Sequence, residues 1–251
     1  MTEDMSVSIK EKADEQTNKL YASMRKKFGH INALANGYRS QKYFLAEQEI
    51  LISTIDQDAK NIFDIGCGSG LILEPLLSDR INTIGIDFNH DACHAAYQNR
   101  LPVIRGDAYN LPIASNCIDQ VTNCQFLNQQ KLGSPNYLFK EIYRILKPGG
   151  SATIIWRNGT ALIHRIAHVI LVVYDLARSM PIFPQVNHRI NDVCKQAKNS
   201  GFDLEIKELM FPLFRWRSKN INGFLGIVIG ASCLIKIRKP PEPNPYGKLD
   251  I

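Results

Sequence analysis

An acidic residue and three alternating glycines follow a short apolar segment, and together they are the strongest candidate for a ligand site in the sequence. The segment Asn61–Ile65 is too short for a helix of its own and is typical of a buried strand. Gly66, Gly68 and Gly70 would weaken a helix or a strand, but they suit a tight turn whose backbone lies against a ligand. A helix that begins there would direct free N–H groups at that ligand. Asp64 can pair with the ammonium group of an amino-acid moiety.

Two more acidic residues lie at the spacing that a nucleoside-like ligand requires. Asp87 closes the predicted strand Ile81–Asp87, 21 residues after Gly66, where a carboxylate can accept hydrogen bonds from both ribose hydroxyls. Asp107 closes the next predicted strand, where an acid can accept a hydrogen bond from an adenine amine. The glycines follow a G-x-G-x-G pattern instead of the G-x-G-x-x-G pattern of dinucleotide sites, which fits a ligand without a long pyrophosphate.

Strands and helices alternate along most of the chain, which predicts an α/β fold with a parallel sheet and helices on both faces. The predicted strands are 61–65, 81–87, 101–106, 117–124 and 151–156, with two closing strands at 203–211 and 231–238. The predicted helices are 71–77, 91–99, 137–146 and 185–200, and Lys147–Gly150 is expected to end the third of them. The glycine turn and Asp87 are therefore expected at the carboxyl ends of neighbouring strands, where open α/β sheets bind ligands.

Composition and charge narrow the class of protein. The 251 residues suit one large α/β domain, or one domain with attachments, and the hydrophobic content of 45% argues against overall disorder. The net charge of +6 permits a nucleic-acid or anionic membrane partner without requiring one. The six cysteines contain no C-x-x-C pair, so no metal site is predicted. The polar N-terminal residues indicate no secretory signal, and a cytoplasmic location with free thiols is expected.

Four motifs, in this order, resemble those of the class I S-adenosylmethionine-dependent methyltransferases. They are Phe63–Gly70, Gly85–Asp87, Gly106–Ala108 and Ile145–Gly150, and the resemblance extends from about Glu47 to Trp156. It implies a Rossmann-like, doubly wound and mostly parallel seven-stranded sheet, with an antiparallel closing strand and a helical cap. It also implies S-adenosyl-L-methionine as the cofactor.

The resemblance assigns cofactor-binding roles residue by residue. The methionine moiety is expected at the glycine turn, the ribose at Asp87, and the adenine at Asp107 and Ala108 with Phe88 stacked on it or covering it. Arg39 is a candidate partner for the methionine carboxylate, with a surface role as the alternative. The full set of expected cofactor contacts is Asp64, Gly66, Cys67, Gly68, Gly70, Asp87, Phe88, Asp107, Ala108, Asn123, Gln125 and Arg39.

Methyl transfer from a sulfonium mainly requires the protein to align acceptor and methyl group and to exclude water. A hydroxyl acceptor also needs a base, and histidine is the usual choice. His164, His168 and, further along, His188 follow the fifth strand, although each can equally be a surface or core-edge residue. The candidate substrate contacts are Trp156, Arg157, Tyr38 and Tyr43, with packing as the alternative for Trp156.

The class of acceptor follows from one insertion and two absent motifs. The segment 161–184 carries an apolar run and is expected to form a cap over a small hydrophobic acceptor, such as a quinone-like ring, lipid or polyketide. The fourth strand ends in Asn123–Phe126 (NCQF) instead of the Asn/Asp-Pro-Pro-Tyr/Phe motif of amide N-methyltransferases, and no Pro-Cys nucleophile is present. These absences argue against nucleic acid as the substrate. An RNA methyltransferase and a non-catalytic S-adenosylmethionine-binding partner protein remain alternatives, and basic residues beside the apolar segments allow peripheral contact with a membrane.

Five parts of the chain are expected. They are an N-terminal helical lead or lid (1–54), the cofactor-binding core (55–160), the helical cap insert (161–184), a C-terminal helix with closing strands (185–239) and a proline-rich tail (240–251).

Overall fold

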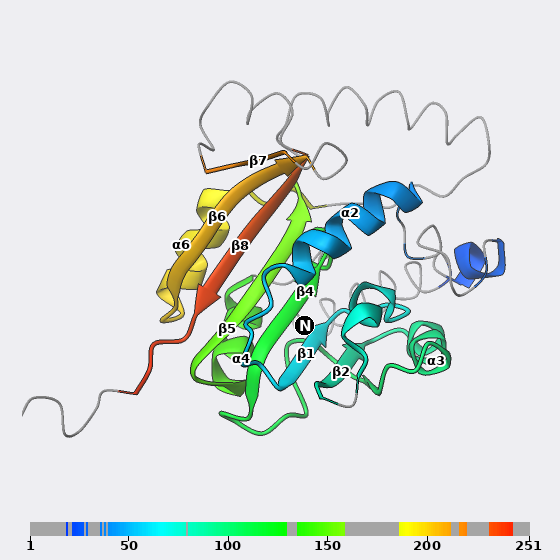
Figure 1. Cartoon of the computed structure of the whole chain (residues 1–251), viewed down its shortest axis with the longest axis horizontal. Coiled ribbons are helices and arrows are strands. Elements are labelled where there is room, and N and C mark those ends of the chain that lie inside the picture. Colours follow the sequence, from blue (N-terminus) through cyan, green and yellow to red (C-terminus); the bar gives the residue numbers. More distant parts are fainter. Residues whose placement is uncertain are drawn as a thin grey trace, which may run out of the picture.

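One mixed sheet with helices on both faces forms the core of the protein (Figure 1). The computed structural model describes residues 19, 22–27, 29, 36, 38, 40–78, 80–129, 135–158, 186–211, 216–219 and 231–242. Within these residues the sheet has eight strands in the order β3-β2-β1-β4-β5-β8-β6-β7. The predicted cap insert 161–184 lies outside the described residues, as do Arg39, His164 and His168.

The first five strands run parallel and the later ones run antiparallel to their neighbours. The strands are β1 (Asn61–Ile65), β2 (Asn82–Asp87), β3 (Val103–Arg105), β4 (Ile118–Cys124), β5 (Leu146–Arg157), β6 (Asp203–Phe211), β7 (Trp216–Ser218) and β8 (Ser232–Arg238). β1 pairs in parallel with both β2 and β4, and β4 pairs in parallel with β5. β8 is inserted between β5 and β6 and is antiparallel to both. This confirms the predicted α/β architecture with its antiparallel closing strand.

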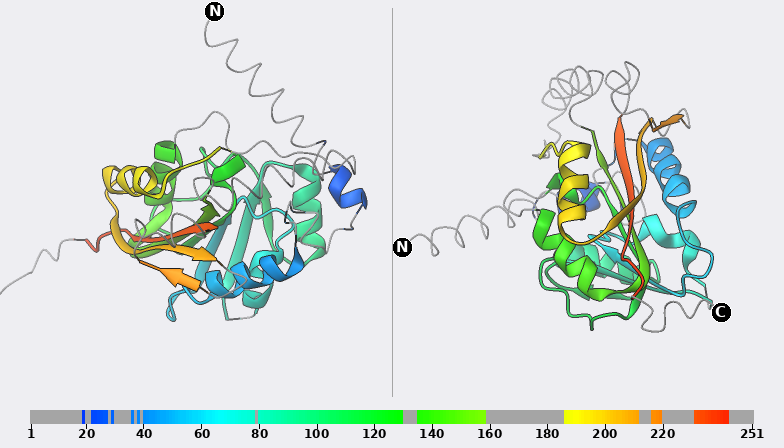
Figure 2. Two further views of the ribbon diagram at one scale, coloured as in Figure 1. Left: turned by 90° about the horizontal axis from the view of Figure 1, so that it is seen from above. Right: turned by 90° about the vertical axis from the view of Figure 1, so that its left-hand side faces the viewer.

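Helices cover the two faces of the sheet through complementary apolar surfaces. The helices are α2 (Gln41–Ile52), α3 (His90–Gln98), α4 (Pro135–Ile145) and α6 (Ile190–Asn199), with short 3₁₀ helices η2 (Leu71–Leu76) and η3 (Leu127–Gln129). In the right-hand view of Figure 2, α2 lies on one side of the sheet and α4 and α6 lie on the other. On α4, Leu138, Phe139, Ile142 and Ile145 are fully buried, as the helical period of their spacing predicts. Alternate residues of the strands fill the two cores: Ile155 packs toward α2, whereas Ile154 packs toward α4 and α6.

Three local predictions are corrected by the structure. The sheet has eight strands instead of seven, because the three residues of β7 add to its edge. The predicted helix 71–77 is a 3₁₀ helix, and Pro75 within it cannot donate the backbone hydrogen bond that a regular helix needs. Lys147–Gly150 belongs to β5 instead of forming a separate stop, and α4 ends at Ile145.

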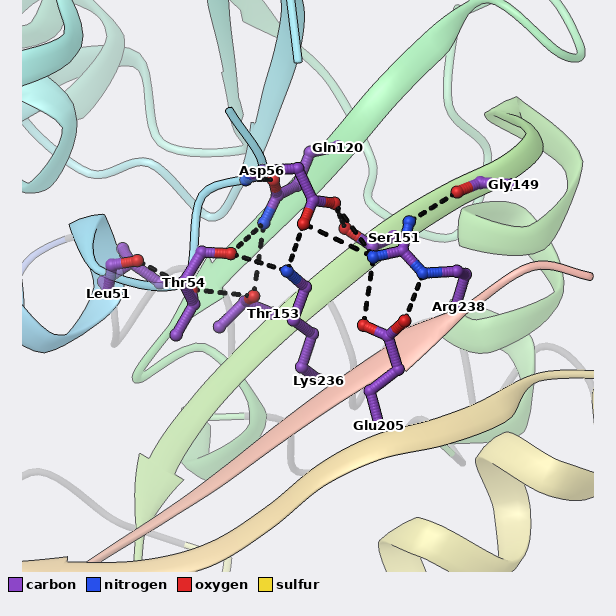
Figure 3. A network of polar contacts seen from close by, with 10 residues as sticks. All are labelled: Leu51, Thr54, Asp56, Gln120, Gly149, Ser151, Thr153, Glu205, Lys236 and Arg238. Atoms are coloured by element: carbon purple, nitrogen blue, oxygen red, sulfur yellow. Dashed lines mark hydrogen bonds and ion pairs between the residues drawn. The ribbon is translucent and has the colours of Figure 1, made fainter. Parts of the chain in front are cut away.

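A partly buried ionic network connects the loop after α2 to β8 (Figure 3). The Lys236 ammonium donates to an Asp56 carboxylate oxygen and, over 2.8 Å, to the Thr54 carbonyl. Arg238 pairs with the other Asp56 oxygen at 3.2 Å and also with Glu205. Ser151, which lies opposite Gln120 on the neighbouring strand β4, donates to Asp56 over 2.6 Å. The network lies at the amino ends of β4 and β5, opposite the end of the sheet where the glycine turn is found.

No helix within the described ranges combines the length and the apolar character needed to cross a membrane.

Candidate functional site

The glycine turn connects the carboxyl end of β1 to η2 and is fastened to the neighbouring strand. The backbone N–H groups of Gly66 and Cys67 both donate to the Ile86 carbonyl on β2, over 2.9 and 3.0 Å. Gly66 has a φ of +74°, and a Cβ there would stand 2.6 Å from the Phe126 ring. Because both the backbone angle and the space exclude a side chain, this position requires glycine. The turn is therefore a fixed backbone surface, as the sequence predicted, but a 3₁₀ helix follows it and not an α-helix.

Asp87 joins the glycine turn to the start of α3. Its Oδ2 accepts a hydrogen bond from the Gly68 backbone N–H over 2.9 Å, and its Oδ1 accepts one from the Asn89 N–H over 2.8 Å. Burial raises the pKa of Asp87, and these two N–H donors partly offset the rise. Since the two carboxylate oxygens together can accept four hydrogen bonds, the carboxylate keeps capacity to accept from a ligand's hydroxyl as well.

Asp64 presents a buried acceptor atom that lacks a donor. Only 1% of the residue is exposed, and its Oδ1 accepts a hydrogen bond from the Thr122 hydroxyl over 2.7 Å. Its Oδ2 has no hydrogen-bond partner among the described residues. Burial raises the pKa of Asp64 to about 7, with a further contribution from the charge of Asp87 and an opposing one from Thr122. An unpaired buried carboxylate oxygen is unfavourable unless a cation arrives, so this atom suits a ligand's ammonium group.

The predicted adenine-side residues follow β2 and β3. Half of the Phe88 side chain is exposed, which leaves its ring free to cover a ligand. Asp107 Oδ1 accepts a hydrogen bond from the Tyr109 N–H over 2.9 Å, and Ala108 is buried. Together with Asp64, Asp87 and the glycine turn, these residues fit a ligand with an amino-acid moiety, a ribose and a flat base.

Comparisons with known proteins identify the fold and the domain. Residues 63–154 match a family model described as a methyltransferase domain. The chain therefore carries a methyltransferase domain, and its fold is that of S-adenosylmethionine-dependent methyltransferases. The matched residues include the glycine turn, Asp87 and most of the strand pair β4–β5, and S-adenosylmethionine is the cofactor of this domain.

Curated relatives of the methyltransferase are distant in sequence. It is 25% identical over 150 residues to a demethylmenaquinone methyltransferase of Corynebacterium kroppenstedtii, an alignment that covers 60% of this chain and 63% of that protein. It is 23% identical over 213 residues to the demethylmenaquinone methyltransferase of Staphylococcus epidermidis, which covers 80% of this chain and 83% of the relative.

Solved structures share the fold. A possible histamine N-methyltransferase from Thermotoga maritima is similar with a TM-score of 0.60 and 20% identity, over 78% of this chain and 88% of that one. An S-adenosylmethionine-dependent methyltransferase from Archaeoglobus fulgidus has a TM-score of 0.62 and 18% identity, over 82% of this chain and 98% of that one.

The carboxyl end of β4 in the methyltransferase carries two amide side chains whose nitrogens are already bonded. Asn123 is fully buried and donates through Nδ2 to the Ile65 carbonyl over 2.9 Å, while its Oδ1 has no partner among the described residues. Gln125 has a φ of +61°, and its N–H donates to the Ile155 carbonyl over 2.7 Å. A positive φ is uncommon outside glycine and often marks a functional position.

Glu47 is a buried residue at this end of the sheet that belongs to none of the sequence motifs. It belongs to α2, is fully buried, and accepts hydrogen bonds from Tyr38, Gln125 and Ser232. Burial raises the pKa of Glu47, and the donors from Ser232 and Gln125 oppose that rise. Nothing in the local sequence marks it, because glutamate is a common surface residue of helices.

The predicted acceptor-side residues differ in their environments. Tyr38 and Tyr43 lie beside Glu47: the Tyr38 hydroxyl donates to it over 3.0 Å, and the Tyr43 hydroxyl bonds the Ser232 hydroxyl over 2.6 Å. The positive charge of Arg157, at the end of β5, opposes the rise in the pKa of Glu47 that burial causes. Trp156 is fully buried, and its indole N–H donates to the His188 carbonyl over 3.0 Å, as the packing alternative expects.

His188 lies outside the regular elements, between β5 and α6. Burial lowers its pKa, and the Leu127 carbonyl opposes that shift, so the imidazole is neutral near pH 7. Its Nε2 is buried and has no partner among the described residues. Of the three histidines selected from the sequence, it is the one that the structure describes.

The pKa of Asp64 predicts a pH-dependent affinity for the cofactor. A carboxyl group with a pKa of about 7 is charged above pH 7 and neutral below it. We expect the affinity for S-adenosylhomocysteine, measured by calorimetry, to fall by about 10- to 30-fold between about pH 7.5 and about pH 5.5. The ligand's own α-amino group stays protonated over the lower part of this range, so the loss reports on the protein.

The matched control for this pH profile is Asp64→Asn, whose side chain is neutral at every pH. This variant should bind the ligand weakly and with a much flatter profile. An equally steep profile in the variant would show that another group is responsible.

Proposed function

We propose that the methyltransferase transfers a methyl group to a small, hydrophobic, ring-containing acceptor of the quinone or lipid type. The observation that supports this most directly is that the curated relatives in two bacterial genera are named demethylmenaquinone methyltransferases. The carboxyl end of β4 is consistent with such an acceptor, because Asn123–Phe126 (NCQF) lacks the two prolines of the Asn/Asp-Pro-Pro-Tyr/Phe motif typical of nucleic-acid and protein amide methylation.

In this function, the described side chains at the carboxyl ends of β1, β2 and β3 bind the cofactor. Asp64 pairs with the amino group of the methionine moiety, Asp87 accepts from the ribose hydroxyls, and Phe88 with Asp107 and Ala108 binds the adenine. The bound cofactor supplies an activated methyl group on a sulfonium. The protein's part is to hold the acceptor in line with that group and to exclude water.

On the acceptor side, we assign Tyr38, Tyr43, Gln125 and Arg157 to the wall of the acceptor site. A hydroxyl acceptor also needs a base, which the proposal places on a histidine after β5: His164, His168 or His188. Neutral His188 with its unbonded Nε2 has the protonation state that a base requires.

The division of the chain is part of the proposal. Residues 1–54 act as a lid and residues 161–184 as a cap on the acceptor side, around the core 55–160, while 185–239 close the sheet. Basic residues near β7 favour peripheral contact with a membrane: Lys219 is exposed, whereas Arg217 is paired with Glu208 at 2.6 Å. The six cysteines are free thiols, which supports a cytoplasmic location.

A methyl-labelling experiment tests the class of acceptor. Purified protein is incubated with S-adenosylmethionine labelled in its methyl group and with heat-treated bacterial extract, which is then separated into lipid, RNA, protein and polar metabolites. We expect label in the organic-soluble lipid fraction. The Asp87→Ala variant, treated identically, is expected to leave every fraction unlabelled.

Two results would contradict the proposal. Label in RNA or protein would exclude a small hydrophobic acceptor. Tight cofactor binding without label in any fraction would instead favour a non-catalytic binding protein.

A further inference from the structure

The side-chain amide of Gln125 is held in one orientation by a carboxylate. Its Nε2 lies 2.8 Å from Oε1 and 2.9 Å from Oε2 of Glu47. Carboxylate oxygens only accept hydrogen bonds, so the atom that faces them must be the amide nitrogen. The amide oxygen of Gln125 therefore points away from Glu47, and it accepts no hydrogen bond from the described residues.

The backbone supports the same orientation. Gln125 is the first residue after β4 and adopts a positive φ, which redirects its side chain from the course of the strand. Its own N–H is bonded to Ile155 on β5 over 2.7 Å, which fixes the backbone. Only 9% of the residue is exposed, and its unbonded amide oxygen is not among the fully buried unpaired atoms, so a donor group of a ligand can reach it.

Glu47 is itself fixed by donors from distant parts of the chain. Tyr38 donates to its Oε2 over 3.0 Å, and Ser232 on β8 donates to its Oε1 over 2.7 Å. Since the Ser232 hydroxyl has one proton, which it gives to Glu47, the Tyr43 hydroxyl must donate to Ser232. Burying a carboxylate costs free energy, and an apolar side chain would pack at this position without that cost. We therefore assign Glu47 a role in the site.

We propose that Glu47 is a positioning residue that orients Gln125 so that its amide oxygen accepts a hydrogen bond from an O–H or N–H group of the methyl acceptor. The inference rests on the proposed function, because it places the acceptor at the carboxyl end of β4. The molecule that receives the methyl group must then carry a hydrogen-bond donor at this position, since an amide oxygen cannot form a hydrogen bond with a carbonyl or an ether.

Selectivity between two probes of similar size tests this role. The probes are 1-naphthol, which has a donor, and 1-methylnaphthalene, which has none, and their dissociation constants are measured on protein loaded with S-adenosylhomocysteine. We expect the unaltered protein to prefer 1-naphthol by about tenfold, as one net hydrogen bond in a desolvated site implies.

Three variants separate orientation from general stability. Glu47→Leu removes the acceptor for the Gln125 amide nitrogen, and Gln125→Met removes the amide itself, so both are expected to lose the preference for 1-naphthol. Glu47→Gln keeps one carbonyl oxygen for that nitrogen and is expected to retain most of the preference. Glu49→Leu, an exposed change on the same helix, is the control with no expected effect.

The affinity for S-adenosylhomocysteine should remain within about twofold in the Glu47 and Glu49 variants, because neither residue is assigned to the cofactor. Gln125 is itself an expected cofactor contact, so the two probes are compared on Gln125→Met at a saturating concentration of S-adenosylhomocysteine. If Glu47→Leu does not fold, Gln125→Met and Glu47→Gln still carry the test. Unchanged discrimination in Gln125→Met would overturn the role of the Gln125–Glu47 pair alone. Failure of the unaltered protein to bind either probe would overturn the proposed function and this inference together.

Discussion

Asp87→Ala is expected to weaken binding of S-adenosylhomocysteine by at least about 100-fold while the protein stays folded. The ribose assignment gives the carboxylate two hydrogen bonds from the cofactor's hydroxyls, and hydrogen bonds to a charged acceptor contribute about 1.5–3 kcal/mol each. Losing two of them removes about 3–6 kcal/mol, where 1.4 kcal/mol corresponds to tenfold in affinity. Calorimetry gives the affinity, and circular dichroism with thermal melting checks the fold.

Asp87 also holds the Gly68 N–H, so the loss of affinity has two possible origins that must be separated. A cofactor analogue without the two ribose hydroxyls makes the distinction. If Asp87 binds the hydroxyls, the analogue should bind the unaltered protein and Asp87→Ala about equally. Asp91→Ala, a neighbouring exposed acid, should bind the full cofactor normally. Unchanged affinity in Asp87→Ala would refute the ribose assignment.

Asp56→Ala is expected to lower the free energy of unfolding by about 3–5 kcal/mol, because it leaves buried Lys236 without its carboxylate. For a chain of this size the melting temperature should fall by about 10 °C. Glu205→Ala removes the exposed partner of Arg238 and should lower the free energy of unfolding by about 1 kcal/mol or less. Since the network lies opposite the cofactor site, Asp56→Ala should leave cofactor affinity at low temperature unchanged. An equal effect of the two variants on stability would show that burial of the network does not matter.

Acidic pH should remove the contribution of Asp56 to the free energy of unfolding, as Asp56→Ala does. Burial alone would raise the pKa of Asp56, but hydrogen bonds from Lys236 and Ser151 and the charges of Lys236 and Arg238 outweigh it and hold the pKa below its ordinary value. A carboxyl group with a lowered pKa stabilises the folded state above its unfolded pKa, and that stability is lost as the pH falls toward the folded pKa. Unaltered protein should therefore approach the stability of Asp56→Ala under acidic conditions.

The cofactor-binding residues could be predicted because each of them belongs to a short motif in the sequence. The glycines, Asp64 and Asp87 are each tied to the end of one strand, and strand order then brings them together. The strand boundaries agree with the prediction to within a few residues, apart from β5, which begins earlier. β7 was missed because its three residues lie in a basic connection without alternation.

The acceptor half could not be predicted in the same way. Glu47 is 78 positions from Gln125 and 185 positions from Ser232 in the sequence, so no short motif contains either pair. The same holds for Lys236 and Asp56, which are 180 positions apart. In sequence, Glu47 and Lys236 resemble ordinary surface charges of a helix and a strand, and only the tertiary structure shows that both are buried.

The insertion of β8 between β5 and β6 has a consequence for how the chain is made on the ribosome. The cofactor turn and five parallel strands are complete once residue 157 has emerged, but β5 then has an unpaired edge. Such an edge is a template for aggregation, and it stays open until residues 232–238 are translated. Because Ser232 and Lys236 belong to that strand, a nascent chain can form the cofactor turn long before the Glu47 cluster and the Asp56 network exist. We therefore expect premature termination before codon 232 to yield chains that depend on chaperones.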